Sequence, residues 1–520
     1  MTKLFRLTLV VATASFLAVV SCSKPEKTAV IENASVETIE SQAASGDVEA
    51  QYQLGKKYIL GDGVPKNSIE SINWFRKAAA QGETRSQFNL GLIYSSGEGI
   101  IADDVEAVRW YRMAADQGFA RAQYQLGFMY SKGRGLEKDE VQAVNWYRKA
   151  AEQGNAMGQL DLGFVYSKGR GIEHDAEKAI YWYRKSAEQG NAQAQHNLGV
   201  HYGNGTGVAK DDVEAVNWYR KAAEQGRAGS QYNLASRYAS GRGVVEDDDA
   251  ANDLYLKAAE QGHARAQYSL GRRYYYGDGI AADPDQASKW IRKAANNGNA
   301  KGAYSLGAMY AAGVNVEADE ALAVDWFRKS AKSGFAEAKF NLGLMYSQGR
   351  GVIEDDDEAE EWYLKSVEKG DPALQYRLAN TYYSGAGIRS DYVEAAKWYE
   401  KAAEQGNVEA QRQLAEMYTS GTGVGQDDFE AVKWNRKAAE QGNAEAQYNL
   451  AQMYAKAKGV KRQSDVLAYM WTSLAAAEGY GRANSFQSTL GGSMTLADVE
   501  NAKRLARICT ESKYTNCGWD

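Results

Sequence analysis

Residues 214–226 read EAVNWYRKAAEQG, and nearly the same residues occur at 142–154 (QAVNWYRKAAEQG) and 430–442 (EAVKWNRKAAEQG). Within this phrase the apolar residues recur at positions i, i+3, i+4, i+7 and i+8, which is typical of an amphipathic helix with one buried face. The glycine that follows is suited to end the helix. A chain that repeats one helical phrase is predicted to be an array of one structural unit.

The repeat extends over most of the 520 residues, with a period of 36 positions. Tryptophan and leucine mark two parallel grids, and only Leu254 interrupts the tryptophan grid. The tryptophans are Trp74, Trp110, Trp146, Trp182, Trp218, Trp290, Trp326, Trp362, Trp398 and Trp434, and the leucines run from Leu54 to Leu450. A second helical pattern precedes the phrase in each unit, and a glycine-containing turn joins the two. The sequence therefore predicts about twelve helical hairpins in tandem.

The first helix of each unit explains why the hairpins should stack. With 100° per residue, Leu126 and Tyr130 fall on one side of the helix, whereas Tyr124 falls on the opposite side. A helix that is apolar on two opposite sides must be sandwiched between neighbours. Gly127 lies between these sides, where a larger side chain would hold a neighbouring helix away. Each hairpin is therefore expected to bury its apolar faces against the next one.

The unit has the pattern A-x-A-Q-Y-x-L-G-x-x-Y-x-x-G-x-G-V-x-x-D-x-x-x-A-x-x-W-Y-R-K-A-A-E-Q-G, which resembles the Sel1-like repeat, a relative of the tetratricopeptide repeat. The resemblance covers roughly residues 47–479 and departs from the pattern at Leu254, Asn315 and Ala457. It implies an all-α fold: an α/α solenoid, wound as a right-handed superhelix, of about twelve 36-residue helix-turn-helix repeats with a C-terminal capping helix. It also implies that the first helices line a concave face.

Four segments are expected along the chain. Residues 1–21 read as a signal peptide, because Lys3 and Arg6 flank an apolar run that is too short to span a bilayer comfortably. Residues 22–40 are expected to form a lipidated N-terminus and a flexible tether, 41–479 the repeats, and 480–520 the capping helix and tail.

The residues around Cys22 resemble a bacterial lipobox, which implies acylation of Cys22 and an outer-membrane-anchored lipoprotein facing the periplasm or the cell surface. The alternative is an ordinary signal peptide with an incidental cysteine. In an oxidising compartment, Cys509 and Cys517 are predicted to form a disulfide that holds the C-terminal tail. A helix is expected to begin near Thr495.

Several function classes are disfavoured by the sequence. A formal charge of −6 argues against nucleic acid, which requires concentrated basic residues. The His196–His201 spacing does not place two metal ligands on one helical face. Ser366 and Lys369 match S-x-x-K, but the S-D-N and K-T-G partners of a β-lactamase signature are missing. We expect no catalysis, no cofactor, no metal, and a monomer whose membrane contact is the N-terminal lipid alone.

A row of mostly polar side chains on the first helices is the first candidate binding surface. The row comprises Gln53, Asn89, Gln125, Asp161, Asn197, Asn233, Ser269, Ser305, Asn341, Arg377, Gln413 and Asn449. Carboxamides offer donors and an acceptor, and a regular row of them suits the backbone of an extended peptide in the concave groove. A second interpretation is that these amides are merely solvated or bond between adjacent helices. Both interpretations remain open at this stage.

A neighbouring row changes from apolar to polar along the chain. Leu92, Phe128, Phe164 and Val200 make its N-terminal part apolar, whereas Ser236, Arg272, Asn380, Glu416 and Gln452 are polar. We expect the apolar part to hold an apolar segment of a partner.

The favoured function is a non-catalytic, protein-binding scaffold of the cell envelope. The family resemblance includes bacterial Sel1-like proteins that bind secretory immunoglobulin A, which makes a host protein the most specific partner prediction. A periplasmic assembly factor for envelope or exopolysaccharide machinery is the alternative. A β-lactamase-like or cell-wall hydrolase is a third, weaker reading.

Overall fold

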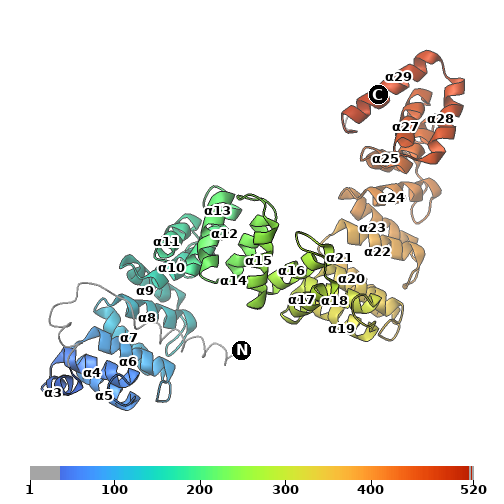
Figure 1. Ribbon diagram of the computed structural model, residues 1–520. Helices are drawn as coiled ribbons and strands as arrows, with labels where there is room; N and C mark the ends of the chain where they lie inside the picture. Colours follow the sequence, from blue (N-terminus) through green and yellow to red (C-terminus); the bar gives the residue numbers. More distant parts are fainter. Residues whose placement is uncertain (1–34, 515–516, 518–520) are drawn as a thin grey trace. The chain divides into compact units, whose positions relative to one another are not determined.

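The computed structural model describes residues 35–514 and residue 517, and these contain twenty-seven α-helices and no strand (Figure 1). The predicted signal peptide, Cys22 and most of the predicted tether lie outside the described residues. Two compact units make up the chain: the first ends at Gln261 and the second begins at Gly262. This boundary follows the repeat in which Leu254 replaces tryptophan.

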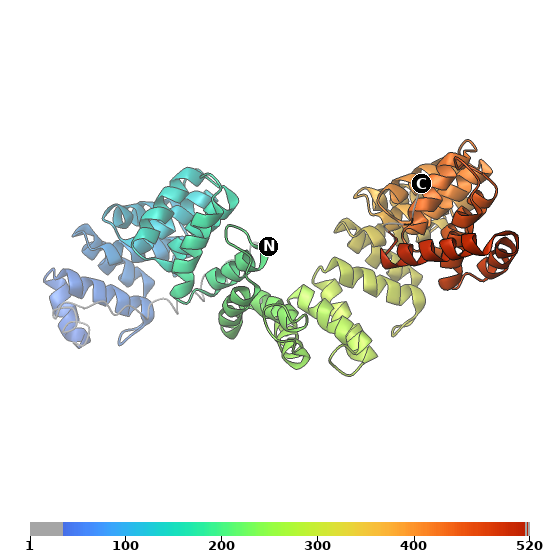
Figure 2. The ribbon, with the colours of Figure 1, turned by 90° about the horizontal axis from the view of Figure 1, so that it is seen from above.

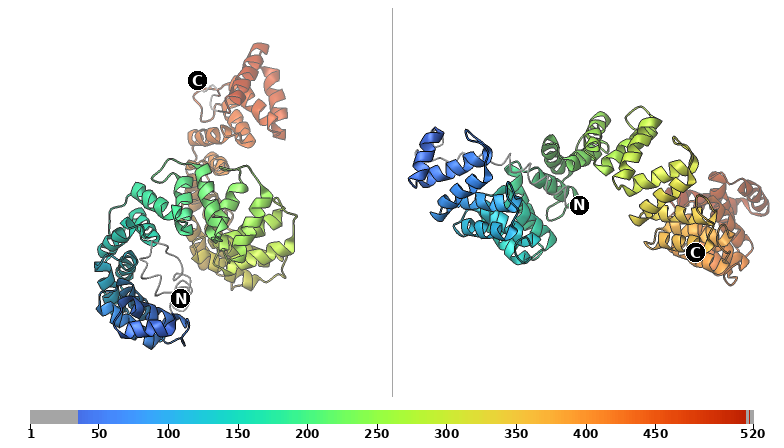
Figure 3. Two further views of the ribbon diagram at one scale, coloured as in Figure 1. Left: turned by 60° about the vertical axis from the view of Figure 1, so that its left-hand side comes forward. Right: turned by 90° about the horizontal axis from the view of Figure 1, so that it is seen from below.

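The first unit contains thirteen helices, whose successive hairpins follow a curved path in the left view of Figure 3. They are α3 (Val36–Ala44), α4 (Val48–Leu60), α5 (Ser68–Ala80), α6 (Thr84–Ser96), α7 (Asp104–Asp116), α8 (Ala120–Lys132), α9 (Glu140–Glu152), α10 (Ala156–Lys168), α11 (Ala176–Glu188), α12 (Ala192–Asn204), α13 (Asp212–Glu224), α14 (Ala228–Tyr238) and α15 (Asp248–Glu260). Each even-numbered helix from α4 pairs with the odd-numbered helix that follows it.

The second unit contains fourteen helices and continues the same pairing (Figure 2). They are α16 (Ala264–Tyr276), α17 (Pro284–Asn296), α18 (Ala300–Ala312), α19 (Glu320–Lys332), α20 (Ala336–Ser347), α21 (Asp356–Val367), α22 (Pro372–Ser384), α23 (Tyr392–Glu404), α24 (Val408–Ser420), α25 (Asp428–Ala439), α26 (Ala444–Ala455), α27 (Asp465–Ala477), α28 (Gly481–Ser493) and α29 (Leu496–Glu511). The predicted all-α solenoid of 36-residue hairpins is confirmed.

Short polar side chains cap the N-termini of many helices, and glycine ends many of them. Asp139 caps α9 by accepting a hydrogen bond from the Gln142 N–H at 2.9 Å. Asn155 caps α10 in the same way, accepting from the Gly158 N–H at 2.8 Å. Between α8 and α9, Gly133 has φ +65°, a left-handed conformation that suits glycine at the end of a helix.

The tyrosine that follows six of the ten grid tryptophans is the deeper core residue of those repeats. Tyr111 is 1% exposed, and its ring lies directly on the backbone of the first helix at Gly91: a Cβ there would lie 2.5 Å from Tyr111 Cδ1. The tryptophans are mostly half-buried, and Lys149 Nζ lies 4.0 Å from the centre of the Trp146 ring. The helical glycine therefore makes room for the tyrosine ring.

Glutamine side chains link three helices at each of several junctions. Gln123 on α8 donates to the Ala115 carbonyl of α7 at 3.2 Å and accepts from Gln153, which follows α9, at 2.7 Å. Because Gln123 is 5% exposed, these hydrogen bonds satisfy a buried amide. In the second unit, Ala303 and Lys339 occupy the corresponding position in two successive repeats and interrupt the pattern.

The turn of each repeat also contacts the preceding repeat. Arg134 Nη2 donates to the Asp104 carboxylate at 2.5 Å and to the Ser95 carbonyl at 3.2 Å. Gly135 has φ +67°, and a Cβ there would lie 2.1 Å from the Asp104 carbonyl oxygen. The second glycine of the turn is thus required by both its conformation and its close approach to α7.

Two segments at the ends of the array differ from the sequence prediction. Helix α3 begins at Val36, inside the stretch 22–40 that was expected to be a flexible tether. Ile39 and Ala43 occupy the tyrosine and alanine positions of the repeat and are buried, so α3 serves as the second helix of a half repeat. At the other end, α28 precedes the predicted capping helix, which begins after Thr495 as α29.

The two turn glycines that the sequence replaces still adopt left-handed backbone. Asn315 has φ 56° and Ala457 has φ 54°. Asparagine tolerates this region, whereas alanine there costs about 1–2 kcal/mol. In the described part of the chain, no helix combines the length and apolar character needed to cross a bilayer.

Candidate functional site

The predicted polar row lies half-buried along the first helices, and several of its members bond within the protein. Asn341 Nδ2 donates to the Tyr304 hydroxyl of the preceding repeat at 3.4 Å, and Asn197 Oδ1 accepts from Gln193 at 2.9 Å. Asn89 and Asn233 hydrogen-bond tyrosine hydroxyls in the same way. Gln125 and Asn449 are half-buried in the same row. Bonding between neighbouring elements thus occurs, and ligand binding by this row stays a prediction.

The predicted apolar row is carried by α6, α8, α10 and α12. Leu92 and Val200 are half-buried and pack against core clusters of the first unit. Phe128 is also half-buried, whereas Phe164 is 37% exposed. Of the four residues, Phe164 therefore offers the most apolar surface to a partner.

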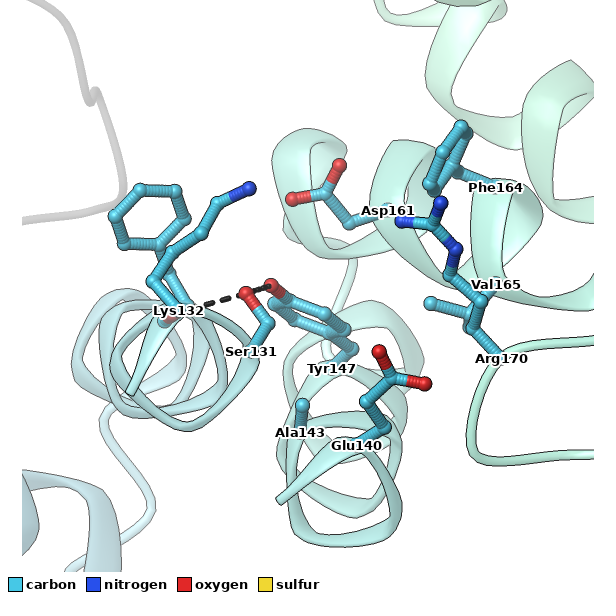
Figure 4. A pocket seen from close by; sticks show the side chains of 10 residues that line it. Ser131, Lys132, Glu140, Ala143, Tyr147, Asp161, Phe164, Val165 and Arg170 are labelled. Carbon is cyan, nitrogen blue, oxygen red and sulfur yellow. Dashed lines mark hydrogen bonds between the residues drawn. The ribbon is translucent and has the colours of Figure 1, made fainter. Parts of the chain in front are cut away.

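Phe128 and Phe164 come together in one pocket of the first unit, which we call the α8–α10 pocket (Figure 4). Its volume is about 170 Å³. It is lined by Phe128, Ser131, Lys132, Glu140, Ala143, Tyr147, Asp161, Phe164, Val165 and Arg170. The first three come from α8, the next three from α9, and the others from α10 and the turn after it. The structure thus joins members of both predicted rows.

Asp161 is the carboxylate of the α8–α10 pocket. It receives a hydrogen bond from the Tyr124 hydroxyl. No Lys, Arg or His nitrogen of the described chain lies within ion-pairing distance of it. Lys132 Nζ lies 5.8 Å from the centre of the Phe128 ring, and the Arg170 guanidinium lies 5.5 Å from that of Phe164. Both cations are exposed. In Figure 4 the Lys132 amino group extends toward the Asp161 carboxylate, and the Arg170 guanidinium lies beside Phe164.

Burial raises the pKa of Asp161 to about 6, against the opposing effects of the Tyr124 hydrogen bond and the positive charge of Lys132. Burial also raises the pKa values of Tyr124 and Tyr147, so both hydroxyls stay protonated at neutral pH. The Tyr147 hydroxyl donates to Ser131 Oγ at 3.1 Å. The pocket therefore combines a poorly solvated carboxylate with neutral hydroxyls and two phenyl rings.

The Asp161→Asn variant should be more stable than the native protein at pH 7.5, by about 1–2 kcal/mol after allowance for partial solvent screening. Because the pKa of Asp161 is raised on folding, the native state binds a proton more readily than the unfolded chain. Native stability at this site is therefore present at low pH and lost as pH rises through about 6.

Urea denaturation at pH 4.5 and pH 7.5 measures this effect. The difference between the two proteins should be largest at the higher pH and clearly smaller at the lower one, where the native state holds Asp161 protonated. An equal difference at both pH values would show that the asparagine acts through packing rather than through the charge.

A second pocket in the second unit is built from equivalent positions, five repeats further along the chain. This α18–α20 pocket is lined by Ala308, Ala311, Ala312, Phe327, Asn341, Leu344, Met345 and Arg350. Asn341 stands where the first pocket has Asp161, and Ala312 stands where it has Lys132. Arg350 is paired with Glu320 at 2.7 Å. The same framework thus presents a charged pocket in one unit and a largely apolar one in the other.

Several lining residues were missed by the sequence reasoning. Tyr147, Lys132 and Arg170 were treated as part of the helical phrase or the turn, and nothing in one repeat indicates that they meet across two. Asp161 was seen only as one member of the polar row. Its signal was chemical: it is the one carboxylate among the amides, hydroxyls and single arginine of that row.

Cys509 and Cys517 are joined by a disulfide in the structure. Both are buried, and they belong to the same apolar cluster as Trp471 and Leu474 of α27. The bond therefore fixes Cys517 beside the end of α29, in the apolar cluster to which α27 also contributes.

A model of the Sel1 repeat matches twelve segments, from 48–83 to 444–480. The chain is similar to c5321, whose crystal structure is described as that of a protective antigen present in uropathogenic Escherichia coli strains and displaying an SLR fold. The two sequences are 33% identical. The match covers 93% of this chain and 96% of c5321, with a TM-score of 0.67. A Sel1 repeat protein from Oxalobacter formigenes is 33% identical over 64% of this chain and 99% of that one, with a TM-score of 0.48. No curated protein matches the chain.

Proposed function

The chain belongs to the Sel1 repeat family, whose members are generally protein-interaction scaffolds. On this premise we propose that the protein is a non-catalytic scaffold of the bacterial envelope. It would capture a protein partner along its first helices. The observation that carries the proposal is the α8–α10 pocket. It gathers exposed aromatic surface and a poorly solvated carboxylate on one side of consecutive hairpins. Aromatic and charged groups placed in this way suit a docking site for a side chain of a partner.

The proposed location rests on the sequence and on one relative. The residues around Cys22 support acylation and attachment to the outer membrane. The c5321 protein is described as a protective antigen, and an antigen that protects must be reached by host immunity. In its most specific form, the proposal is that the protein is displayed at the cell surface and binds a host protein such as secretory immunoglobulin A.

We expect the double variant Phe128→Asp, Phe164→Asp to abolish partner capture. A photo-crosslinking residue placed at Gln125 in live cells should link the native protein to its partner, whereas the double variant should lose at least nine-tenths of that product. Two new carboxylates beside Asp161 would repel each other and remove the apolar walls of the pocket.

A matched control is Val105→Asp with Val213→Asp, because both valines are more than half exposed and lie outside the pocket. The control should keep both helicity and capture. Retained capture in the phenylalanine variant would place the docking site elsewhere on the array.

Protease treatment of intact cells tests the proposed location. Cleavage of the chain on intact cells supports surface display. Protection on intact cells, followed by cleavage after the outer membrane is opened, would favour the periplasm.

A further inference from the structure

The α8–α10 and α18–α20 pockets form a natural comparison within one chain, because their lining residues occupy the same positions of the repeat. Asp161 and Asn341 have nearly the same shape but differ by one charge at neutral pH. Phe128 and Phe164 in the first pocket are replaced by Ala308 and Leu344 in the second. The framework is therefore shared, and the charge and the aromatic walls distinguish the first pocket.

We propose that the α8–α10 pocket is a receptor for a basic side chain, an arginine or a lysine, of an extended partner segment whose flanking residues are acidic. This inference rests on the proposed scaffold function and specifies the chemistry of the partner. The inserted cation would pair with the Asp161 carboxylate between the rings of Phe128 and Phe164.

The first argument is the unmatched charge of the pocket. Asp161 has a single hydroxyl donor, Tyr124, and no ion pair in the described chain. Lys132 is the cation whose charge acts on Asp161, but it does not form an ion pair with the carboxylate. A guanidinium or ammonium group inserted beside this half-buried carboxylate would supply the direct ion pair and additional hydrogen bonds. Glu140, the other carboxylate of the pocket, already pairs with Lys138 at 2.8 Å, so Asp161 is the group left to be matched.

The second argument is the arrangement of the apolar and positive groups around this carboxylate. Phe128 and Phe164 come from successive first helices and line the pocket, and the face of a phenyl ring attracts a cation. Each ring already has such a neighbour, Lys132 or Arg170. These two cations are exposed, so they are able to turn toward acidic residues on either side of the inserted side chain.

The α18–α20 pocket has the same framework but lacks the carboxylate and the phenylalanines of the α8–α10 pocket. With Asn341 at its polar position and Ala308, Ala312 and Leu344 around it, it has no free carboxylate and no aromatic wall from its first helices. Arg350 there is held by Glu320. A neutral side chain suits this pocket, and a basic one has nothing there to match its charge.

Fluorescence anisotropy with the full chain tests the proposal. The probe is a fluorescein-labelled peptide, Gly-Glu-Glu-Arg-Glu-Glu-Gly amide, and its matched control carries citrulline in place of arginine. Citrulline keeps the shape of arginine but is neutral. We expect the arginine peptide to bind about ten- to a hundred-fold more tightly, the range of a charge-assisted hydrogen bond.

The isosteric variant Asp161→Asn should remove this preference and leave the ratio near one, whereas the reference variant Asn341→Asp should leave it unchanged. Circular dichroism confirms that both variants fold. Equal binding of the two peptides, a preference that persists in Asp161→Asn, or no binding of either peptide would each overturn the inference. None of these results depends on capture in cells, so the proposed scaffold function is judged separately by the crosslinking at Gln125.

Discussion

Replacement of Tyr111 by alanine is expected to lower the free energy of unfolding by about 3–5 kcal/mol, as is typical for removal of a buried aromatic ring. Tyr111 is 1% exposed, and its ring lies against the backbone of α6 at Gly91. The helix backbone cannot move into the space left by the ring without breaking its contact with the rest of the hairpin. A cavity at the centre of the repeat is therefore the expected result.

Urea denaturation followed by circular dichroism measures this loss, and hydrogen exchange of α6 and α7 locates it. The Tyr111→Phe variant removes only the hydrogen bond to Ser95 and should cost about 1 kcal/mol. Trp110→Ala is the matched control at the adjacent position. Because the Trp110 ring is only half-buried, its removal should lower the free energy of unfolding by less than half as much as Tyr111→Ala. Equal losses for Trp110 and Tyr111 would mean that the two rings contribute equally to the core, contrary to this prediction.

The Gly135→Ala variant should destabilise the first unit by about 2–5 kcal/mol. One part of this cost is the left-handed backbone at φ +67°, which alanine adopts poorly. The larger part is steric, because the new Cβ would lie 2.1 Å from the Asp104 carbonyl oxygen. This contact is to backbone at the start of α7, so no side chain can rotate away, and the turn must separate from the preceding repeat. The ion pair between Arg134 and Asp104 would weaken with it.

Gly154→Ala separates the two contributions. Gly154 has φ +84°, but nothing lies within 4 Å of a Cβ placed there. The variant should therefore lower the free energy of unfolding by only about 1–2 kcal/mol, because alanine adopts the left-handed backbone conformation less readily than glycine. The difference between the two variants, read from their urea midpoints, measures the contact between successive repeats. Equal losses of stability in the two variants would show that the turn at Gly135 makes no close contact with the preceding repeat.

The architecture was predictable because its signals repeat. Leu126 and Gly127 lie where the helical projection places them, and both are buried. Helix α3 was missed because a half repeat lacks the tryptophan and leucine that mark the grid, although Ile39 and Ala43 are in phase with it. Helix α28 was missed because residues 481–493 contain neither the phrase nor a strong apolar period.

The candidate site was predictable only in part. Phe128 and Phe164 were identified because a helical projection shows which side of a helix is free of the packing stripes. A helical projection does not show which residues of other helices lie next to Phe128 and Phe164. Tyr147 comes from a different helix, and Arg170 from a turn in the next repeat, so their meeting with Asp161 depends on how two hairpins pack.

By itself, the sequence determined the all-α repeat architecture and the two-helix pattern of the repeats from 48 to 480. A 36-residue period with alternating helices and turns is a local property, and local sequence is sufficient to specify it. Only the tertiary structure decided that the residue after the tryptophan, most often tyrosine, fills the centre of the hairpin, and that Asp161 shares a pocket with two phenylalanines and forms no ion pair with another described residue. Those facts depend on distances between separate repeats, which packing sets and a linear pattern does not contain.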